Sequence, residues 1–167
     1  INLKSSIDST NKVITIDAIA AGITAIDNFG VEINIPEGVT KDDITVSPNY
    51  GTNITGAGNF LVSTTDQTGN GIALTNGKLV TITIALKEAL AEDFTFTLQN
   101  KSAIKELNAA SYKISNGTLE AASTTVNKWI DPSAPTPKPT SPARPTIAPV
   151  PTENPDQTPV PTDVPSG

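Results

Sequence analysis

Strict alternation of apolar and polar residues is the feature that most constrains what this chain can fold into. In the segment FGVEINI, Phe29, Val31, Ile33 and Ile35 alternate with polar or small residues. Successive side chains of a β-strand point to opposite faces, so this period of two predicts a strand with one buried and one solvated face. LVTITIAL (79–86) and FTFTL (94–98) repeat the pattern and predict two more strands of the same kind.

Short Val-, Ile- and Thr-rich segments between turn-forming residues predict the other strands. They lie near Val13–Ala18, Phe60–Thr64 and Tyr112–Ser115, with another after Thr118. Asn76-Gly77 and Asn116-Gly117 are dipeptides favoured in tight hairpin turns. Lys87–Asp93 has room for one helical turn, and Lys101–Ala110 is expected to form a loop or short helix. About eight or nine strands predict an all-β fold, a two-sheet antiparallel β-sandwich of the jelly-roll or immunoglobulin-like type.

Composition changes abruptly near Asp131. The segment 131–167 contains twelve of the 14 prolines and none of the seven aromatic residues. Such a segment buries too little apolar surface to offset its ordering entropy, so it is expected to be disordered or an extended, polyproline-like tail. We therefore expect a sandwich module at 1–130 and a Pro/Thr-rich linker at 131–167. A PxxP ligand for an aromatic groove is the less favoured interpretation of this tail.

The residue inventory excludes several function classes. The chain has no cysteine and no histidine, which removes the commonest nucleophile–base pairs and zinc ligands. A net charge of −6 with one arginine argues against nucleic acid as a partner. No apolar run approaches the ~20 residues needed to span a bilayer, so membrane insertion is not expected.

Acidic residues offer two remaining candidates for chemistry. The pairs Asp42-Asp43 and Glu92-Asp93 supply carboxylates of the kind glycosidases use, but solvated loops explain them better. The segment DQTGNG from Asp66 begins like a calcium-binding loop, yet Gly77 stands where the closing glutamate is required. We therefore predict no enzyme activity and neither a catalytic nor a metal site.

The order of elements resembles a cohesin module of bacterial cellulosome scaffoldins and cell-surface anchoring proteins. The resemblance covers most of residues 20–122 in pattern and rests on ITAIDNFGVEINIPEGVTKDDITV, FLVSTTDQTGNGIALTNGKLVTITIALKEAL and FTFTLQNKSAIKELNAASYKISNGTLEA. The Pro/Thr-rich segment is similar to the linkers that join cellulosomal modules. The resemblance implies a secreted or cell-surface, bacterial protein that binds the dockerin module of polysaccharide-degrading enzymes.

The resemblance also implies a binding surface on one sheet face. By position, the family's partner contacts fall on Asn28 and Gly30, on Leu61 and Ser63, and on Asp66 and Gly69. No cofactor is implied for this chain, since the calcium of such complexes belongs to the dockerin. Alternation places Asn28 and Gly30 on the solvated face, but in FLVST it leaves open whether Leu61 or Phe60 is exposed.

Two alternatives remain open. A carbohydrate-binding module would need exposed aromatic rings, and the candidates for stacking on a glycan are Tyr50, Tyr112 and Trp129. A passive structural stalk would need no ligand. A flat face of mixed polarity favours the protein-binding hypothesis, and a row of aromatic rings favours the glycan hypothesis.

Overall fold

The computed structural model describes residues 1–55, 58–99, 101–114 and 122–131, and within these ranges it contains twelve strands and two short 3-10 turns. The strands are β1 (Asn2–Asp8), β2 (Val13–Ile19), β3 (Ala25–Asn34), β4 (Ile44–Ser47), β5 (Gly51–Thr55), β6 (Asn59–Thr65), β7 (Ile72–Ala73), β8 (Lys78–Ala85), β9 (Phe94–Thr97), β10 (Ala103–Glu106), β11 (Lys113–Ile114) and β12 (Ser123–Val126). The turns are η1 (Lys41–Asp43) and η2 (Thr75–Gly77). The predicted all-β fold is confirmed.

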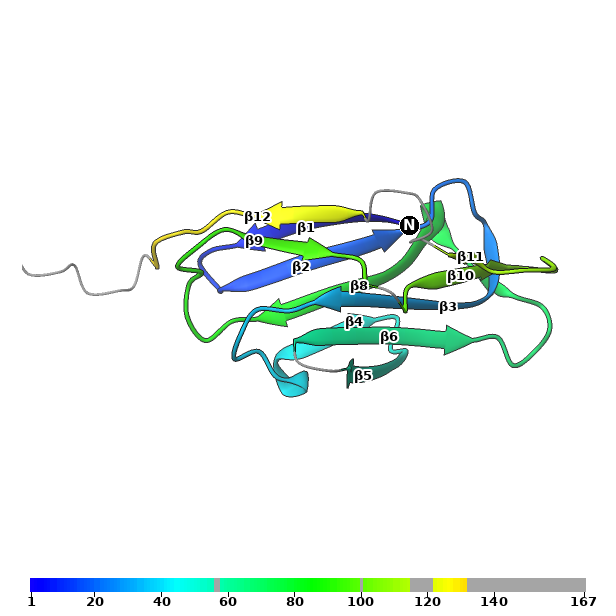
Figure 1. Cartoon of the computed structure of the whole chain (residues 1–167), viewed down its shortest axis with the longest axis horizontal. Helices are drawn as coiled ribbons and strands as arrows, with labels where there is room; N and C mark the ends of the chain where they lie inside the picture. Colours follow the sequence, from blue (N-terminus) through cyan, green and yellow to red (C-terminus); the bar gives the residue numbers. More distant parts are fainter. Residues whose placement is uncertain (56–57, 100, 115–121, 132–167) are drawn as a thin grey trace, which may run out of the picture. The chain divides into compact units, whose positions relative to one another are not determined.

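The strands form two main antiparallel sheets and a two-stranded ribbon (Figure 1). One sheet has the order β1-β2-β8-β4, and the other has the order β11-β10-β3-β6-β5 with β7 also paired to β3. Strands β9 and β12 form the ribbon, which lies beside β1, where the Ser5 and Thr124 hydroxyls are 2.6 Å apart. The two main sheets make the predicted sandwich.

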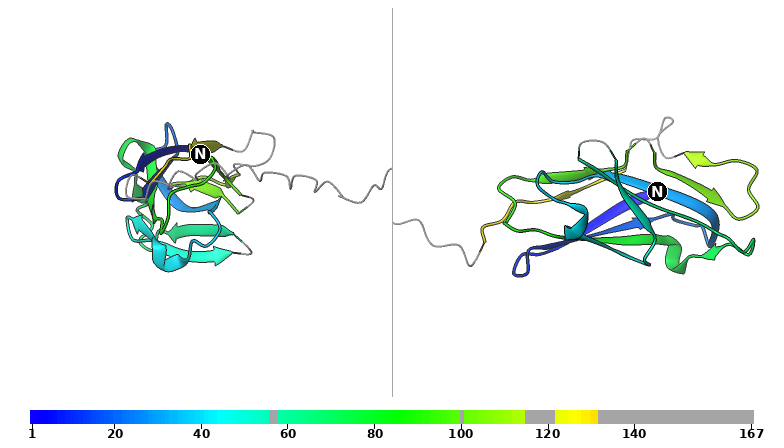
Figure 2. Two further views of the ribbon diagram at one scale, coloured as in Figure 1. Left: turned by 90° about the vertical axis from the view of Figure 1, so that its left-hand side faces the viewer. Right: turned by 90° about the horizontal axis from the view of Figure 1, so that it is seen from below.

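Alternation decides which side chains fill the space between the sheets. Ile14 and Ile16 of β2 and Ile82 and Ile84 of β8 are fully buried, as are Val31 and Ile33 of β3. These residues belong to one continuous apolar cluster that both sheets share, and the end-on view of Figure 2 shows the strand layers on either side of it. Threonines of β8 take the opposite, outward positions, as the sequence predicts.

Neither Lys87–Asp93, where one helical turn is expected, nor Lys101–Ala110, where a loop or short helix is expected, contains a helix. Lys87–Asp93 contains no helix, because its backbone groups bond elsewhere: the Trp129 amide donates to the Leu90 carbonyl at 3.3 Å. Seven residues are also too few for a stable isolated helix. Within Lys101–Ala110, Ala103–Glu106 form strand β10, since pairing with β3 supplies its hydrogen bonds.

Asn76-Gly77 forms a tight turn, but the predicted hairpin is wrong. Both residues have positive φ, 54° and 72°, yet the turn connects β7, paired to β3, with β8 in the opposite sheet. Glycine is required at 77, because an added Cβ would lie 2.4 Å from the Ala20 carbonyl oxygen. The predicted turn at Asn116-Gly117 lies outside the described residues.

The chain after β12 contributes to the sandwich. Trp129 packs against the apolar core, and Asp131 pairs with Lys12 at 2.6 Å. The predicted linker, apart from Asp131, lies outside the described residues. Among those that are described, no helix is long and apolar enough to cross a membrane.

Candidate binding face

Four of the six predicted contact residues share the outer surface of the β10-β3-β6-β5 sheet, which we call the β3–β6 face. Strand register places Gly30 opposite Ser63 and Glu32 opposite Leu61. Asn28 lies two residues along β3 from Gly30, on the same side of the pleat. Asn28 and Gly30 are half-exposed and Ser63 is exposed, so the predicted solvated side of β3 is confirmed at these positions.

Burial shows which side chains of β6 face the core and which face outward, that is, the parity of this strand. Phe60 is 1% exposed and belongs to the core, whereas Leu61 is half-buried and faces outward. Phe60 pairs with Ile33 and Ile54, both of which point inward. Leu61 is therefore an apolar side chain on an otherwise polar surface.

A row of small side chains crosses the centre of the face. Gly51, Ser63, Gly30 and Ala103 are consecutive cross-strand partners on β5, β6, β3 and β10. At about 4.8 Å between strands, the row is on the order of 15 Å long. A Cβ added at Gly30 would lie 3.1 Å from the Lys101 carbonyl oxygen, so larger residues do not fit without movement.

Larger groups flank this row on both sides. On one side, Asn53, Leu61 and Glu32 are cross-strand partners. On the other, Thr65, Asn28 and Lys105 are partners, and the Asn28 amide donates a 3.2 Å hydrogen bond to the Tyr112 hydroxyl. The row thus carries smaller side chains than the residues on either side of it, and the Lys101 backbone lies against it at Gly30.

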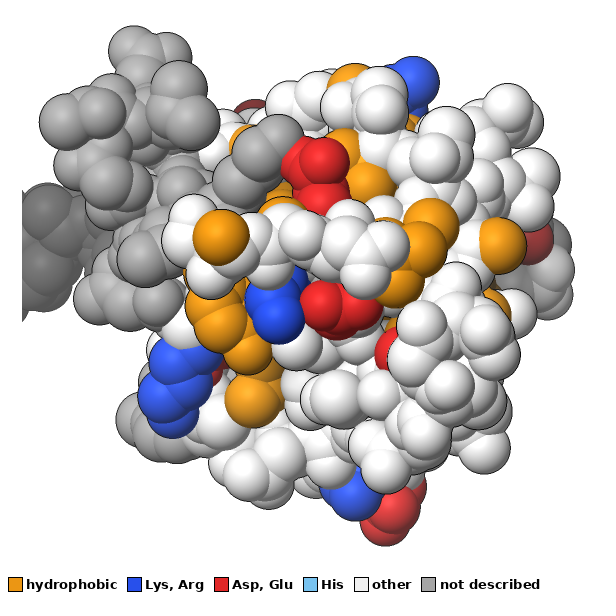
Figure 3. Space-filling view, turned by 90° about the vertical axis from the view of Figure 1, so that its right-hand side faces the viewer, with side chains coloured by type: hydrophobic (Ala, Val, Ile, Leu, Met, Phe, Trp, Pro, Cys, Tyr) orange, Lys and Arg blue, Asp and Glu red, His pale blue; other side chains and the backbone are white. Residues whose placement is uncertain are grey.

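The charges at its border are paired within the chain. Lys105 Nζ lies 3.1 Å from an Asp27 carboxylate oxygen. Figure 3 shows acidic and basic side chains next to each other on the neighbouring end of the molecule, among mostly uncharged groups. The charges of Lys105 and Asp27 at this border therefore balance each other.

Glu32 departs from the alternation prediction, because it is 4% exposed although it belongs to the solvated side of β3. Its carboxylate accepts hydrogen bonds from the Thr55 hydroxyl and from the Lys101 amide, the latter at 3.2 Å. Lys101 lies in the connection from β9 to β10, which the Glu32 carboxylate holds against β3. Glu32 is therefore a structural support for the face.

Asp66 and Gly69 lie beyond the face, in the loop that follows β6. The Asp66 carboxylate accepts hydrogen bonds from the Thr68 amide (2.9 Å), the Thr68 hydroxyl (2.8 Å) and the Gly71 amide (2.7 Å). These bonds, the Thr68 amide first, hold the pKa of Asp66 below its ordinary value. Asp66 is thus engaged in its own loop, and among the described residues no acidic cluster is placed to hold a metal ion.

The three candidate glycan-stacking residues come from separate parts of the fold. Tyr112 is 54% exposed and adjoins the β3–β6 face. Tyr50 is half-buried after β4, and its ring meets Phe29 edge-on at 5.4 Å. Trp129 packs on the core after β12. These positions do not place the three rings in one exposed row.

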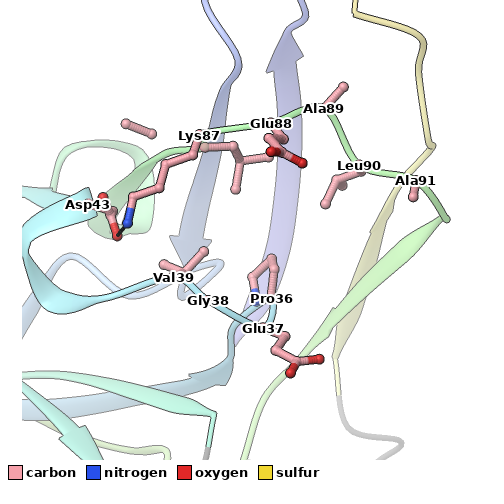
Figure 4. Close-up of a pocket in the computed structure, with 12 residues that line it drawn as sticks. Pro36, Glu37, Gly38, Val39, Asp43, Lys87, Glu88, Ala89, Leu90 and Ala91 are labelled. Carbon is pink, nitrogen blue, oxygen red and sulfur yellow. Dashed lines mark ion pairs between the residues drawn. The ribbon is translucent and has the colours of Figure 1, made fainter.

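The acidic pairs take part in local backbone contacts. Asp43 accepts bonds from the Thr40 amide (2.8 Å) and hydroxyl (2.7 Å) and lies 3.9 Å from Lys87. It borders a hollow of about 350 Å³, shown in Figure 4, whose other lining residues are mainly apolar or small. Asp93 accepts a bond from the Lys128 amide at 2.8 Å.

Sequence reasoning missed several residues of the face. Gly51 and Asn53 lie on β5, and Ala103 and Lys105 lie on β10, two strands that the alternation pattern does not reveal. The sequences GTNIT of β5 and AIKE of β10 contain one and two apolar residues, too few to show alternation. Only the pairing with β6 and β3 identifies them.

The whole chain was compared with known proteins. No protein-family model matches it, and no curated protein matches its sequence. Among solved structures, its fold is similar to a cohesin module from a family 33 glycoside hydrolase of Clostridium perfringens ATCC13124. The similarity has a TM-score of 0.52 at 14% sequence identity and covers 75% of this chain and 94% of the other. The chain therefore has a cohesin-like fold.

Proposed function

We propose that this chain is a non-catalytic binding module of a secreted or cell-surface assembly, and that its β3–β6 face binds a dockerin-type protein module. The fold similarity to a cohesin module is the observation that carries the proposal. Four of the six residues to which the sequence resemblance assigns partner contacts, Asn28, Gly30, Leu61 and Ser63, share one sheet face, and Asp66 and Gly69 lie in the loop beyond it.

The shape of the face suits a helical partner. The row from Gly51 to Ala103 spans on the order of 15 Å, the length of about ten helical residues at 1.5 Å each. Small side chains at Gly51, Ser63 and Ala103 leave room for a helix beside the Lys101 backbone, which lies against Gly30, and the larger groups on each side of the row limit its sideways position.

Leu61 is the apolar anchor in this proposal. It is half-buried before binding, so covering it requires little loss of side-chain freedom. Asn28 and Ser63 supply hydrogen-bonding groups beside it. Since Asp27 and Lys105 neutralise each other, contact and hydrogen bonding contribute more than long-range attraction.

The experiment measures binding of the full chain to a panel of purified dockerins by biolayer interferometry, with calcium and with chelator. We expect at least one dockerin to bind, and to bind only with calcium, because calcium folds the dockerin loops. Leu61→Ala should weaken that binding about tenfold or more. Thr45→Ala, on the outer side of the other sheet, is the control.

A parallel sedimentation assay with cellulose and xylan tests the glycan alternative. Retention on a polysaccharide without any dockerin binding would contradict the proposal, as would binding that persists unchanged in chelator. Failure of both assays would support the structural-stalk alternative.

A further inference from the structure

A second candidate site lies where one sheet passes into the other, away from the β3–β6 face. After β4 the chain crosses through Ser47–Tyr50 to β5, and the η2 turn lies opposite this crossing. Between them is a cavity of about 540 Å³, which we call the Tyr50 cavity. This volume lies within the range of small-molecule sites, roughly 300–1,000 Å³.

One wall of the cavity is apolar and held in place. Tyr50 meets the buried Phe29 ring edge-on, with centroids 5.4 Å apart and an interplanar angle of 81°. Burial raises the pKa of the Tyr50 hydroxyl. Pro48 and Leu74 also line the cavity, as does Ile19, which is the cross-strand partner of Lys78. Because Tyr50 is fixed by the core, little ordering is required when a ligand arrives.

The other wall is polar and electrically balanced. Lys78 Nζ lies 2.9 Å from Asp17 Oδ2, and the Thr81 hydroxyl donates to Asp17 Oδ1 at 2.5 Å. Lys78 Nζ also donates to the Thr81 hydroxyl at 3.5 Å, which leaves one of its three N–H donors for a ligand, and the side chain is 45% exposed. Ser47 and Asn76 are exposed at the rim and add a hydroxyl and an amide.

We propose that the Tyr50 cavity binds a neutral ring that carries several hydroxyl groups, the chemical class of a sugar residue. Such a ring has an apolar face that packs on Tyr50 and Pro48, and an edge of hydroxyls that bonds to Thr81, Lys78 and Asn76. Asp17 neutralises Lys78, which disfavours an anion. The residues proposed to bind protein do not line this cavity, so the two sites have no residue in common.

The test is a titration of the ¹⁵N-labelled full chain, followed by NMR, with the methyl glycosides of glucose, xylose, galactose and N-acetylglucosamine. We expect saturable shifts, at millimolar concentrations of at least one glycoside, in the amides of Tyr50 and of the η2 turn. The amides of Leu61 and Ser63 on β6 should not move.

Asn76→Gly is the informative variant. Asn76 has φ 54° and ψ 31°, a left-handed conformation that glycine adopts without strain, so the exchange removes the amide and preserves the turn. One hydrogen bond predicts about a fivefold loss of affinity. Asn108→Gly is the matched control, because Asn108 has φ 60° outside the cavity lining and should bind like the wild type.

A second variant, Ala73→Trp, places a large ring at an exposed lining position and should abolish the shifts. Absence of shifts with every glycoside would overturn the proposal, as would equal effects of Asn76→Gly and Asn108→Gly. A synthetic peptide of residues 135–167 serves as a competitor. Shifts at the cavity with this peptide and with no sugar would assign the cavity to the Pro/Thr-rich segment and likewise overturn the proposal.

Discussion

Substitution of Glu32 gives the sharpest test of how the β3–β6 face is held. The Glu32 carboxylate is 4% exposed and accepts the Thr55 hydroxyl and the Lys101 amide, so it connects β5, β3 and the β9–β10 connection. Lys101 Nζ is 3.9 Å away, but this side chain is 62% exposed and contributes little. Glu32→Ala removes both hydrogen bonds without altering the apolar core.

The expected loss of unfolding free energy is about 3 kcal/mol. Hydrogen bonds to a charged group contribute roughly 1.5–3 kcal/mol each. We count about 2 kcal/mol for Thr55, which is 9% exposed and loses its acceptor, and about 1 kcal/mol for Lys101, whose amide regains water. Glu32→Gln should cost only about 1 kcal/mol, because its amide group can donate to Thr55 while its oxygen accepts from Lys101.

Urea unfolding measures these values, followed by fluorescence of the single tryptophan, Trp129, and by far-ultraviolet circular dichroism. Coincident transitions from the two probes validate a two-state treatment. Glu37→Ala, at an exposed position, is the matched control and should change stability by less than about 0.5 kcal/mol. A Glu32→Ala variant as stable as the control would refute the reasoning, and so would a Gln variant as unstable as the Ala variant.

Three further predictions concern stability. Phe60→Ala should cost about 3–5 kcal/mol and Leu61→Ala less than about 1.5 kcal/mol in urea unfolding; similar losses would contradict the assigned parity of β6. Burial raises the pKa of Asp17, but Thr81 and Lys78 outweigh it and hold the pKa below its ordinary value. The stability contributed by Asp17 is therefore fully present above the pKa that Asp17 has in the unfolded chain, and it is lost as the pH falls through the lower pKa of the folded state. Asp17→Asn should reduce the difference between the urea midpoints measured at about pH 6 and at about pH 3. Truncation after Ala134 should leave the thermal midpoint unchanged, whereas Trp129→Ala should lower stability by about 2 kcal/mol; a large loss on truncation would show that the tail stabilises the sandwich.

The long, strictly alternating strands are predictable from sequence. In β8, every second residue from Val80 to Ile84 is apolar, and burial follows that pattern. Strands β5 and β10 are not predictable in this way, because they form by pairing with β6 and β3 and carry few apolar positions. The turn at Asn76 shows the same limit, since its local conformation is predictable but the sheets that it connects are not.

The candidate face is predictable only in part. Alternation identifies Asn28 and Gly30 as outward residues, and it leaves β6 ambiguous, because Phe60, Leu61 and Val62 are consecutive apolar residues. It also assigns Glu32 to solvent. The burial of Glu32 depends on Thr55 and Lys101, which lie 23 and 69 residues away in the chain. Contacts at such separations leave no periodic signal in the sequence.

The most direct test of the proposed binding face compares two arginine substitutions at the centres of opposite sheets. Ser63→Arg places a long side chain in the small-residue row, and Thr83→Arg places the same side chain on the outer face of the other sheet, where Thr83 pairs with Thr15 and Thr45. Dockerin affinity is measured by biolayer interferometry with calcium for the wild type and both variants. We predict that Ser63→Arg weakens binding by about 30-fold or more and that Thr83→Arg binds like the wild type. Binding by no dockerin, or a loss caused by Thr83→Arg and not by Ser63→Arg, would contradict the assignment of the β3–β6 face.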